Sequence, residues 1–102
     1  MNTDAKGSYA VVNGLAMYYE VHGTGFPLVL LHGAFTTIDM FAALLPLLAS
    51  TRQIIAVELQ GHGHTADIKR ELRFEYLADD TAALLAHLGI EQADVFGYSL
   101  GG

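Results

Sequence analysis

Residues 94–101 read Asp-Val-Phe-Gly-Tyr-Ser-Leu-Gly, so a short apolar segment runs directly into a G-x-S-x-G motif. A serine hydroxyl is a weak nucleophile until a base takes its proton, and a sharp strand-to-helix turn exposes the oxygen. Such a turn strains the backbone at Ser99, and Gly97 and Gly101 remove side chains that would collide there. The motif predicts that a strand over residues 94–98 presents Ser99 as a nucleophile, rather than as a plain helix cap before a glycine loop.

A second motif, His32-Gly33-Ala34, comes straight after an apolar segment. In acyl transfer the carbonyl oxygen becomes negative in the transition state, and two backbone N–H groups commonly hold it. We expect one donor to be the N–H of Leu100 and the other that of Ala34, with Phe35 as the second choice. His32 and Gly33 support this loop, and we expect His32 to be structural rather than a catalytic base.

The rest of the chain alternates strand and helix patterns. Residues 8–12 and 15–22 flank Asn13-Gly14, the strongest short signal for a hairpin. Residues 28–31 and 53–59 are further expected strands, and the first of them is apolar on both faces, as an interior parallel strand is.

Two helices are expected between these strands. The first begins at Thr36 or Thr37 and extends through Ala49, with Pro46 predicting a kink or an early end inside it. The second covers residues 74–88 and ends at Gly89. Its apolar face is expected to carry Phe74, Leu77, Thr81, Leu84, Leu85 and Leu88. The order predicts an α/β fold, an antiparallel hairpin followed by parallel β-α-β-α-β, ending at the nucleophile elbow.

Composition and charge exclude several classes of protein. Hydrophobic residues make up 52% of the chain, which suits parallel strands covered on both faces. The net charge is -6, and no basic stripe is present to neutralise phosphates, so we expect no nucleic-acid partner. No apolar stretch approaches the roughly 18 residues of a membrane span. We expect a cytoplasmic protein with a small-molecule substrate and no membrane contact.

Together these motifs resemble the α/β-hydrolase superfamily over almost the whole chain, from Val12-Asn13-Gly14 and residues 19–23 to residues 97–102. Gly61-His62-Gly63-His64-Thr65 is similar to the family's Gly-x-Gly-x-Ser/Thr loop. That loop usually opens with Asp-x-Arg, where this chain has Glu58-Leu59-Gln60. The resemblance implies a serine nucleophile whose acid and histidine partners come later in the chain. Only three residues follow Ser99, so the triad acid and histidine are absent from the chain.

The resemblance accordingly implies one incomplete domain over residues 1–102, the N-terminal part of an α/β-hydrolase fold, with residues 1–7 flexible. It also implies the strand order 1-2-4-3-5 onward, in which the last strand here is internal in the full protein. In these residues alone we expect that strand to be an open apolar edge that permits self-association. We expect these residues to be inactive alone, because the base, the acid and the helix after the elbow are missing.

The implied activity is hydrolysis of an ester, lactone or related carbonyl substrate without a cofactor, with Phe35 and Tyr98 as candidate pocket residues. Acyl transfer and cofactor-free peroxidase chemistry stay open, because one scaffold hosts many reactions. A non-catalytic binding or assembly module is the alternative from another class. A haloalkane dehalogenase is disfavoured, since that chemistry places Asp where this chain has Ser99.

Several other polar residues invite a functional reading. His62, His64 and Asp67 suggest a metal pair or an upstream triad, but a divalent site needs three or four ligands, so we expect loop packing and no metal. Asp79 and Asp80 are expected on a solvated helix face. The residues expected in the core rather than in a substrate wall are Tyr18, Tyr19, Phe41 and Phe74.

Overall fold

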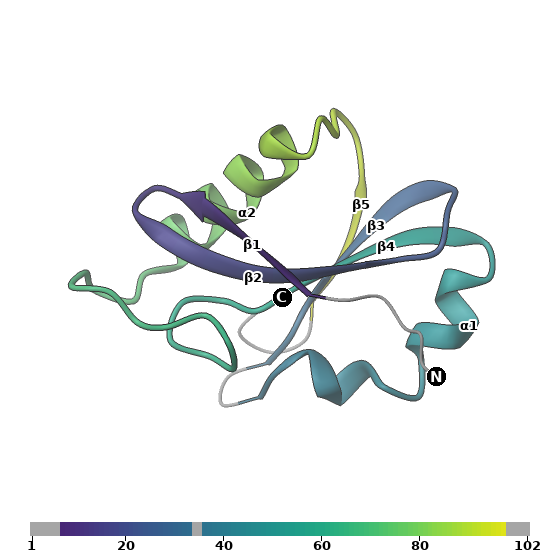
Figure 1. Cartoon of the computed structure of the whole chain (residues 1–102), viewed down its shortest axis with the longest axis horizontal. Helices are drawn as coiled ribbons and strands as arrows, with labels where there is room; N and C mark the ends of the chain where they lie inside the picture. The colour runs from purple at the N-terminus through teal and green to yellow at the C-terminus, as the bar shows by residue number, and fades with distance from the viewer. Residues whose placement is uncertain (1–6, 34–35, 98–102) are drawn as a thin grey trace.

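The computed structural model describes residues 7–33 and 36–97, whose strands form one sheet in the order β1-β2-β4-β3-β5 (Figure 1). β1 (Ser8–Val12) pairs antiparallel with β2 (Leu15–His22), and β2 pairs antiparallel with β4 (Arg52–Val57). β3 (Phe26–Leu31) lies parallel to both β4 and β5 (Asp94–Gly97). The strand order and the hairpin before parallel strands are therefore as predicted.

The hairpin turn has the geometry that its sequence predicts. Asn13 and Gly14 both adopt the left-handed region, with φ of 51° and 81°, and Val12 pairs with Leu15 across the two-residue turn. This is the backbone that a tight hairpin needs, and asparagine and glycine adopt it at least cost. Leu15 and Met17 are fully buried on one face of β2, and Ala16 between them is exposed.

Helices cover both faces of the sheet. α2 (Phe74–His87) packs on one face, where Leu77 and Leu84 join Val29 and Ile55 in a core. A 3-10 helix, η1 (Ile38–Phe41), and the short α1 (Leu45–Ala49) lie over the other face. Because both faces are covered, neighbouring residues of β3 and β4 are buried alternately in the two cores, and residues 28–31 and 54–57 of these strands are all apolar.

The single helix expected from Thr36 or Thr37 through Ala49 is wrong, because the segment divides into η1 and α1. Thr37 does cap η1, accepting a hydrogen bond from the Asp39 N–H at 3.3 Å. Pro46 lies in the first turn of α1. Proline has no N–H and its ring clashes with the preceding turn, so it begins a helix more readily than it continues one.

Two residues of α2 are placed differently from the prediction. Phe74 was expected in the core but is 71% exposed, because it begins the helix beyond the edge of the packed face. Asp80 was expected in solvent but is fully buried. Its position, three residues after Leu77 and four before Leu84, puts it on the packed face of the helix.

β5 forms one edge of the sheet as described, and its Val95 and Phe96 are 60% and 47% exposed. The open edge and the self-association expected of these residues alone stay predictions. Within the described residues, no helix is long and apolar enough to cross a membrane. The sequence predicts that residues 1–7 are flexible, but all of them except Gly7 lie outside the described part of the chain.

Candidate active site

The carboxyl ends of the three parallel strands meet at one edge of the sheet. Leu31, the last residue of β3, is in register with Val57 of β4 and with Gly97 of β5. The loops that follow these strands therefore begin side by side, and this is the edge where open α/β sheets bind ligands. The structure thus brings Gly97, the first glycine of the nucleophile motif, next to the start of the His32-Gly33 loop.

The remaining residues predicted for this site lie outside the described residues, and their roles stay predictions. They are Ala34, Phe35, Tyr98, Ser99, Leu100 and Gly101.

His32 is a buried structural residue. Its Nε2 accepts a hydrogen bond from the Leu59 N–H at 2.9 Å, so that nitrogen carries no proton. The proton is therefore on Nδ1, which donates to the Gly33 carbonyl at 2.8 Å. Burial lowers the pKa of His32 below its ordinary value and keeps the ring neutral. Because both nitrogens are occupied, the geometry agrees with the predicted structural role.

The Gly33 carbonyl is the most heavily bonded group of this loop. It accepts hydrogen bonds from His32 Nδ1–H, from the Thr36 hydroxyl and from the Thr36 N–H, the last at 3.2 Å. On the other side of the residue, the Gly33 N–H donates to Met40 Sδ at 3.3 Å. Hydrogen bonds at both the carbonyl and the N–H thus fix the backbone at Gly33.

Glu58, the first residue after β4, organises the loop of residues 61–65. Its buried carboxylate accepts hydrogen bonds from the Ile38 N–H at 3.2 Å and from the His64 N–H at 2.7 Å. Gly63 has φ of 53°, and a side chain there would overlap the Glu58 carboxylate. Thr65 donates its hydroxyl to the Glu58 carbonyl and accepts from the Tyr18 N–H, at 2.7 and 2.8 Å.

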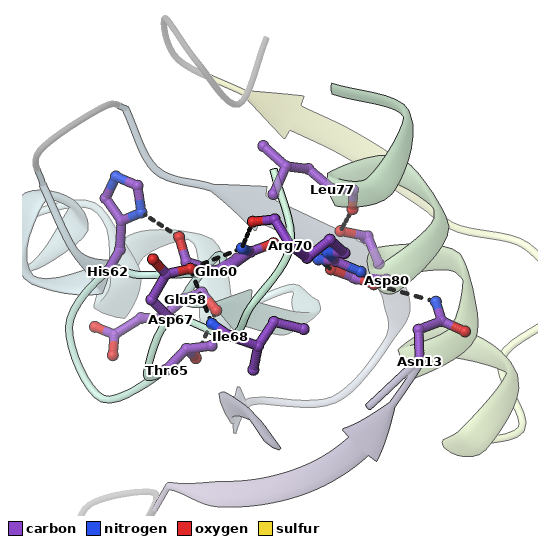
Figure 2. Close-up of polar contacts among 11 residues, drawn as sticks. Asn13, Glu58, Gln60, His62, Thr65, Asp67, Ile68, Arg70, Leu77 and Asp80 are labelled. Carbon is purple, nitrogen blue, oxygen red and sulfur yellow. Dashed lines mark hydrogen bonds and ion pairs between the residues drawn. The ribbon is translucent and has the colours of Figure 1, made fainter. Parts of the chain in front are cut away.

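A second polar network begins at Gln60 and reaches the hairpin turn (Figure 2). Arg70 donates to the Gln60 side-chain oxygen and forms an ion pair with Asp80 at 2.7 Å. Asp80 also accepts from the Asn13 side-chain amide at 3.1 Å. The hydrogen bond to Asp80 raises the pKa of Arg70 above its ordinary range, so the guanidinium stays charged. Among the described residues, every buried side-chain nitrogen and oxygen has a hydrogen-bond partner.

The structure does not bring His62, His64 and Asp67 together as a metal site or a triad. His62 Nδ1 donates to the Gln60 carbonyl at 2.9 Å, whereas His64 Nδ1 contacts Glu58. Asp67 Oδ1 accepts from the Gln60 side-chain amide at 2.7 Å and from the Ile68 N–H at 2.9 Å. No group of three metal-ligating side chains occurs within residues 7–33 and 36–97.

A cavity of about 460 Å³ lies at the carboxyl edge of the sheet, within the size range of small-molecule sites. The loop after β3 contributes Thr36 and Thr37 to its wall, and the loop after β4 contributes residues 60–63. Asp67, Arg70 and Leu72 line it from the segment that leads to α2. His62 reaches this wall with its ring 4.8 Å from that of His32.

Sequence reasoning missed the residues that hold the loop after β4. Glu58 and Gln60 were noted only as a departure from the family's Asp-x-Arg, and Arg70 was not singled out. The helical spacing of Asp80 with Leu77 and Leu84 was a signal for burial.

Comparison with known proteins now identifies the family. The family model for the alpha/beta hydrolase fold matches residues 27–102. A soluble epoxide hydrolase of Corynebacterium sp. is 33% identical over 102 residues, which are all of this chain and 36% of the relative. A pimeloyl-[acyl-carrier protein] methyl ester esterase of Stenotrophomonas maltophilia is 37% identical over 86 residues, 84% of this chain and 31% of the esterase.

The structure of epoxide hydrolase CorEH superposes with a TM-score of 0.92 at 32% identity, covering 96% of this chain and 35% of that one. The chain therefore belongs to the alpha/beta hydrolase family, and its fold matches the N-terminal part of that fold. It spans about a third of the length of these relatives.

Proposed function

We propose that the protein carrying this chain is a serine hydrolase that acts on an ester, lactone or related carbonyl substrate. The observation that carries the proposal is the register of Leu31 with Gly97, because it aligns the end of β5 with the start of the His32-Gly33 loop. A nucleophile at Ser99 and an oxyanion donor at Ala34 would then face one bound carbonyl group. Names of the relatives, an epoxide hydrolase and an ester hydrolase, support hydrolysis as the reaction class.

In the proposed reaction, Ser99 Oγ attacks the substrate carbonyl while a base takes its proton. The oxyanion accepts hydrogen bonds from the N–H groups of Leu100 and Ala34 until the leaving group departs and water releases the acyl group. The bonded Gly33 carbonyl supports the role of Ala34, because the two residues share one planar peptide group.

The base is not His32, since the Leu59 N–H occupies its Nε2. We propose that the base and the acid come from the length of chain that the relatives have beyond this one. We accordingly propose that these 102 residues alone have no significant turnover.

Epoxide hydrolysis is the second candidate. The 33% identity with a soluble epoxide hydrolase over the whole chain favours it, as does the TM-score of 0.92 with the structure of epoxide hydrolase CorEH. Hydrolysis of p-nitrophenyl acetate and of styrene oxide by the full-length protein distinguishes the two substrate classes.

Labelling of the full-length protein with a fluorophosphonate tests the nucleophile. We expect label on Ser99 in the wild type, none in Ser99→Ala, and unchanged labelling in the matched control Ser8→Ala. Ester turnover should disappear with the label. Folded full-length protein that takes no label would contradict the proposal and favour a non-catalytic binding module or a different nucleophile.

A further inference from the structure

We infer that Arg70 is a positioning residue for the site, which acts through Gln60 to fix the His62 ring at the wall of the cavity. The effect on activity rests on the proposed function, whereas the effect on His62 does not. Arg70 and Gln60 both line the cavity, but the bonds described below turn their polar groups toward the protein.

Arg70 binds Gln60 and Asp80 at the same time. Its Nε–H donates to Gln60 Oε1 at 3.0 Å, and its Nη2 donates both to that oxygen and to Asp80 Oδ2. Asp80 is fully buried in α2 and is held from the other side by Asn13. A planar guanidinium offers several donors in a fixed arrangement, so Arg70 connects the loop after β4 to the helix and the hairpin.

Gln60 is thereby fixed in one conformation. It is 1% exposed, its oxygen accepts from Arg70, and its amide donates to Asp67 Oδ1 at 2.7 Å and to the Arg70 carbonyl at 3.1 Å. Because every polar atom of the side chain is bonded, rotation of Gln60 would leave buried groups unpaired. Anchoring the side chain also restrains the backbone from which the carbonyl of this residue projects, and His62 Nδ1 contacts that carbonyl.

The Gln60 carbonyl determines the tautomer of the neutral His62 ring. A carbonyl only accepts, so His62 Nδ1, 2.9 Å away, carries the proton and Nε2 of the neutral ring does not. Figure 2 shows the His62 ring extending from the loop while Arg70 and Asp80 lie on the opposite side of Gln60. The network therefore fixes both the direction and the tautomer of a ring at the cavity wall.

This chain departs from the family's Asp-x-Arg pattern at Gln60, where the pattern has arginine. In this chain a guanidinium reaches the side chain at that position from Arg70, ten residues later.

The test uses Arg70→Lys, Gln60→Met and the double variant in the full-length protein, with Arg73→Met as the matched control. Arg73 is half exposed; its guanidinium pairs with the exposed Glu71 and Glu75 and lies 5.8 Å from the centre of the Tyr76 ring, but it does not bond Gln60 or Asp80. Arg70→Lys retains a positive charge beside Asp80, which protects the fold, but an ammonium cannot reproduce the paired bonds to Gln60.

Nitrogen-15 NMR of the imidazoles is the first readout. We expect wild type and Arg73→Met to show His62 as the single Nδ1–H tautomer at neutral pH. Arg70→Lys and Gln60→Met should show a mixture of tautomers. If His62 in these two variants matches the control, the inference is overturned, whatever the protein's activity.

Kinetics of p-nitrophenyl acetate hydrolysis is the second readout. We expect kcat/KM to fall about tenfold in each single variant, the scale of a small misplacement in a site. The double variant should fall no further, because both changes break one relay. If the loss of kcat/KM in the double variant equals the product of the two single losses, Arg70 does not act through Gln60. If the wild type takes no fluorophosphonate label, the proposed function is contradicted instead. The NMR result then decides by itself whether Arg70 positions His62.

Discussion

The backbone N–H of Leu59 donates a hydrogen bond to Nε2 of His32 across 2.9 Å, although the two residues are 27 positions apart. This contact joins the loop after β3 to the loop after β4 at the edge where the proposed nucleophile strand ends. It also decides the chemistry of His32, because a ring nitrogen that accepts a backbone N–H holds no proton. The histidine nearest the proposed oxyanion loop is thereby a structural acceptor.

Replacement of His32 by phenylalanine should destabilise the protein. The change keeps most of the ring volume but leaves the buried Leu59 N–H without its acceptor, at a cost of about 1–3 kcal/mol. His87→Phe, on the exposed face of α2, should stay within about 0.5 kcal/mol. Urea unfolding of both full-length variants provides the comparison, and equal losses would argue against the buried role of His32.

The stability contributed by His32 should depend on pH. Burial lowers the pKa of His32 in the folded state, whereas in the unfolded chain the ring titrates at its ordinary 6.5. As the pH falls below 6.5, the unfolded state binds more protons than the folded state, so the free energy of unfolding decreases. Urea unfolding across pH should show a smaller decrease for His32→Phe than for the wild type. Parallel pH profiles would show that His32 titrates normally in the fold.

Asp79 and Asp80 should respond to alanine very differently. Asp80→Ala leaves the partly exposed Arg70 guanidinium and the Asn13 amide without the buried acceptor that they share, at a cost of about 1–3 kcal/mol. Asp79 is exposed, so Asp79→Ala should change stability by about 0.5 kcal/mol or less. Thermal unfolding of the two variants measures the difference. Similar melting temperatures would contradict the buried ion pair and would favour the solvated position of Asp80 that the sequence suggested.

Comparison of Gly63→Ala with Gly61→Ala distinguishes backbone strain from steric overlap with Glu58 in the loop after β4. Both positions have positive φ, of 53° and 78°, so both variants should lose about 1–2 kcal/mol from backbone strain. At Gly63 the new methyl group also overlaps the buried Glu58 carboxylate, which adds about 1–3 kcal/mol. At Gly61 its nearest neighbours are Asp67 atoms 3.7 Å away, an ordinary contact. Chemical unfolding should rank Gly63→Ala as the more damaging change, and the reverse order would contradict the packing of Glu58.

Local patterns were sufficient for most of the backbone. Asn13-Gly14 predicted the hairpin, and the apolar runs of β3 and β4 predicted interior strands. The 3.6-residue spacing of Leu77 and Leu84 predicted the packed face of α2. Each of these signals depends on residues within a turn or two of one another, so the sequence alone carries it. The strand order came from resemblance to the family, and the structure agrees with it.

The partners of the polar residues required the tertiary structure. Whether Asp80 faces water or Arg70 depends on where the segment that carries Arg70 passes α2. The spacing of residues within the helix does not predict that position. Pro46 predicted a kink or an early end in the first helix, but the division of the segment into η1 and α1 became visible only in the folded chain. The sequence by itself determined the elements, their order and the position of the nucleophile motif, because these follow from local backbone preferences and apolar periodicity. Only the tertiary structure decided that His32 is an acceptor and that Arg70 serves Gln60, because hydrogen-bond partners far apart in the chain meet only once the sheet and helices have packed.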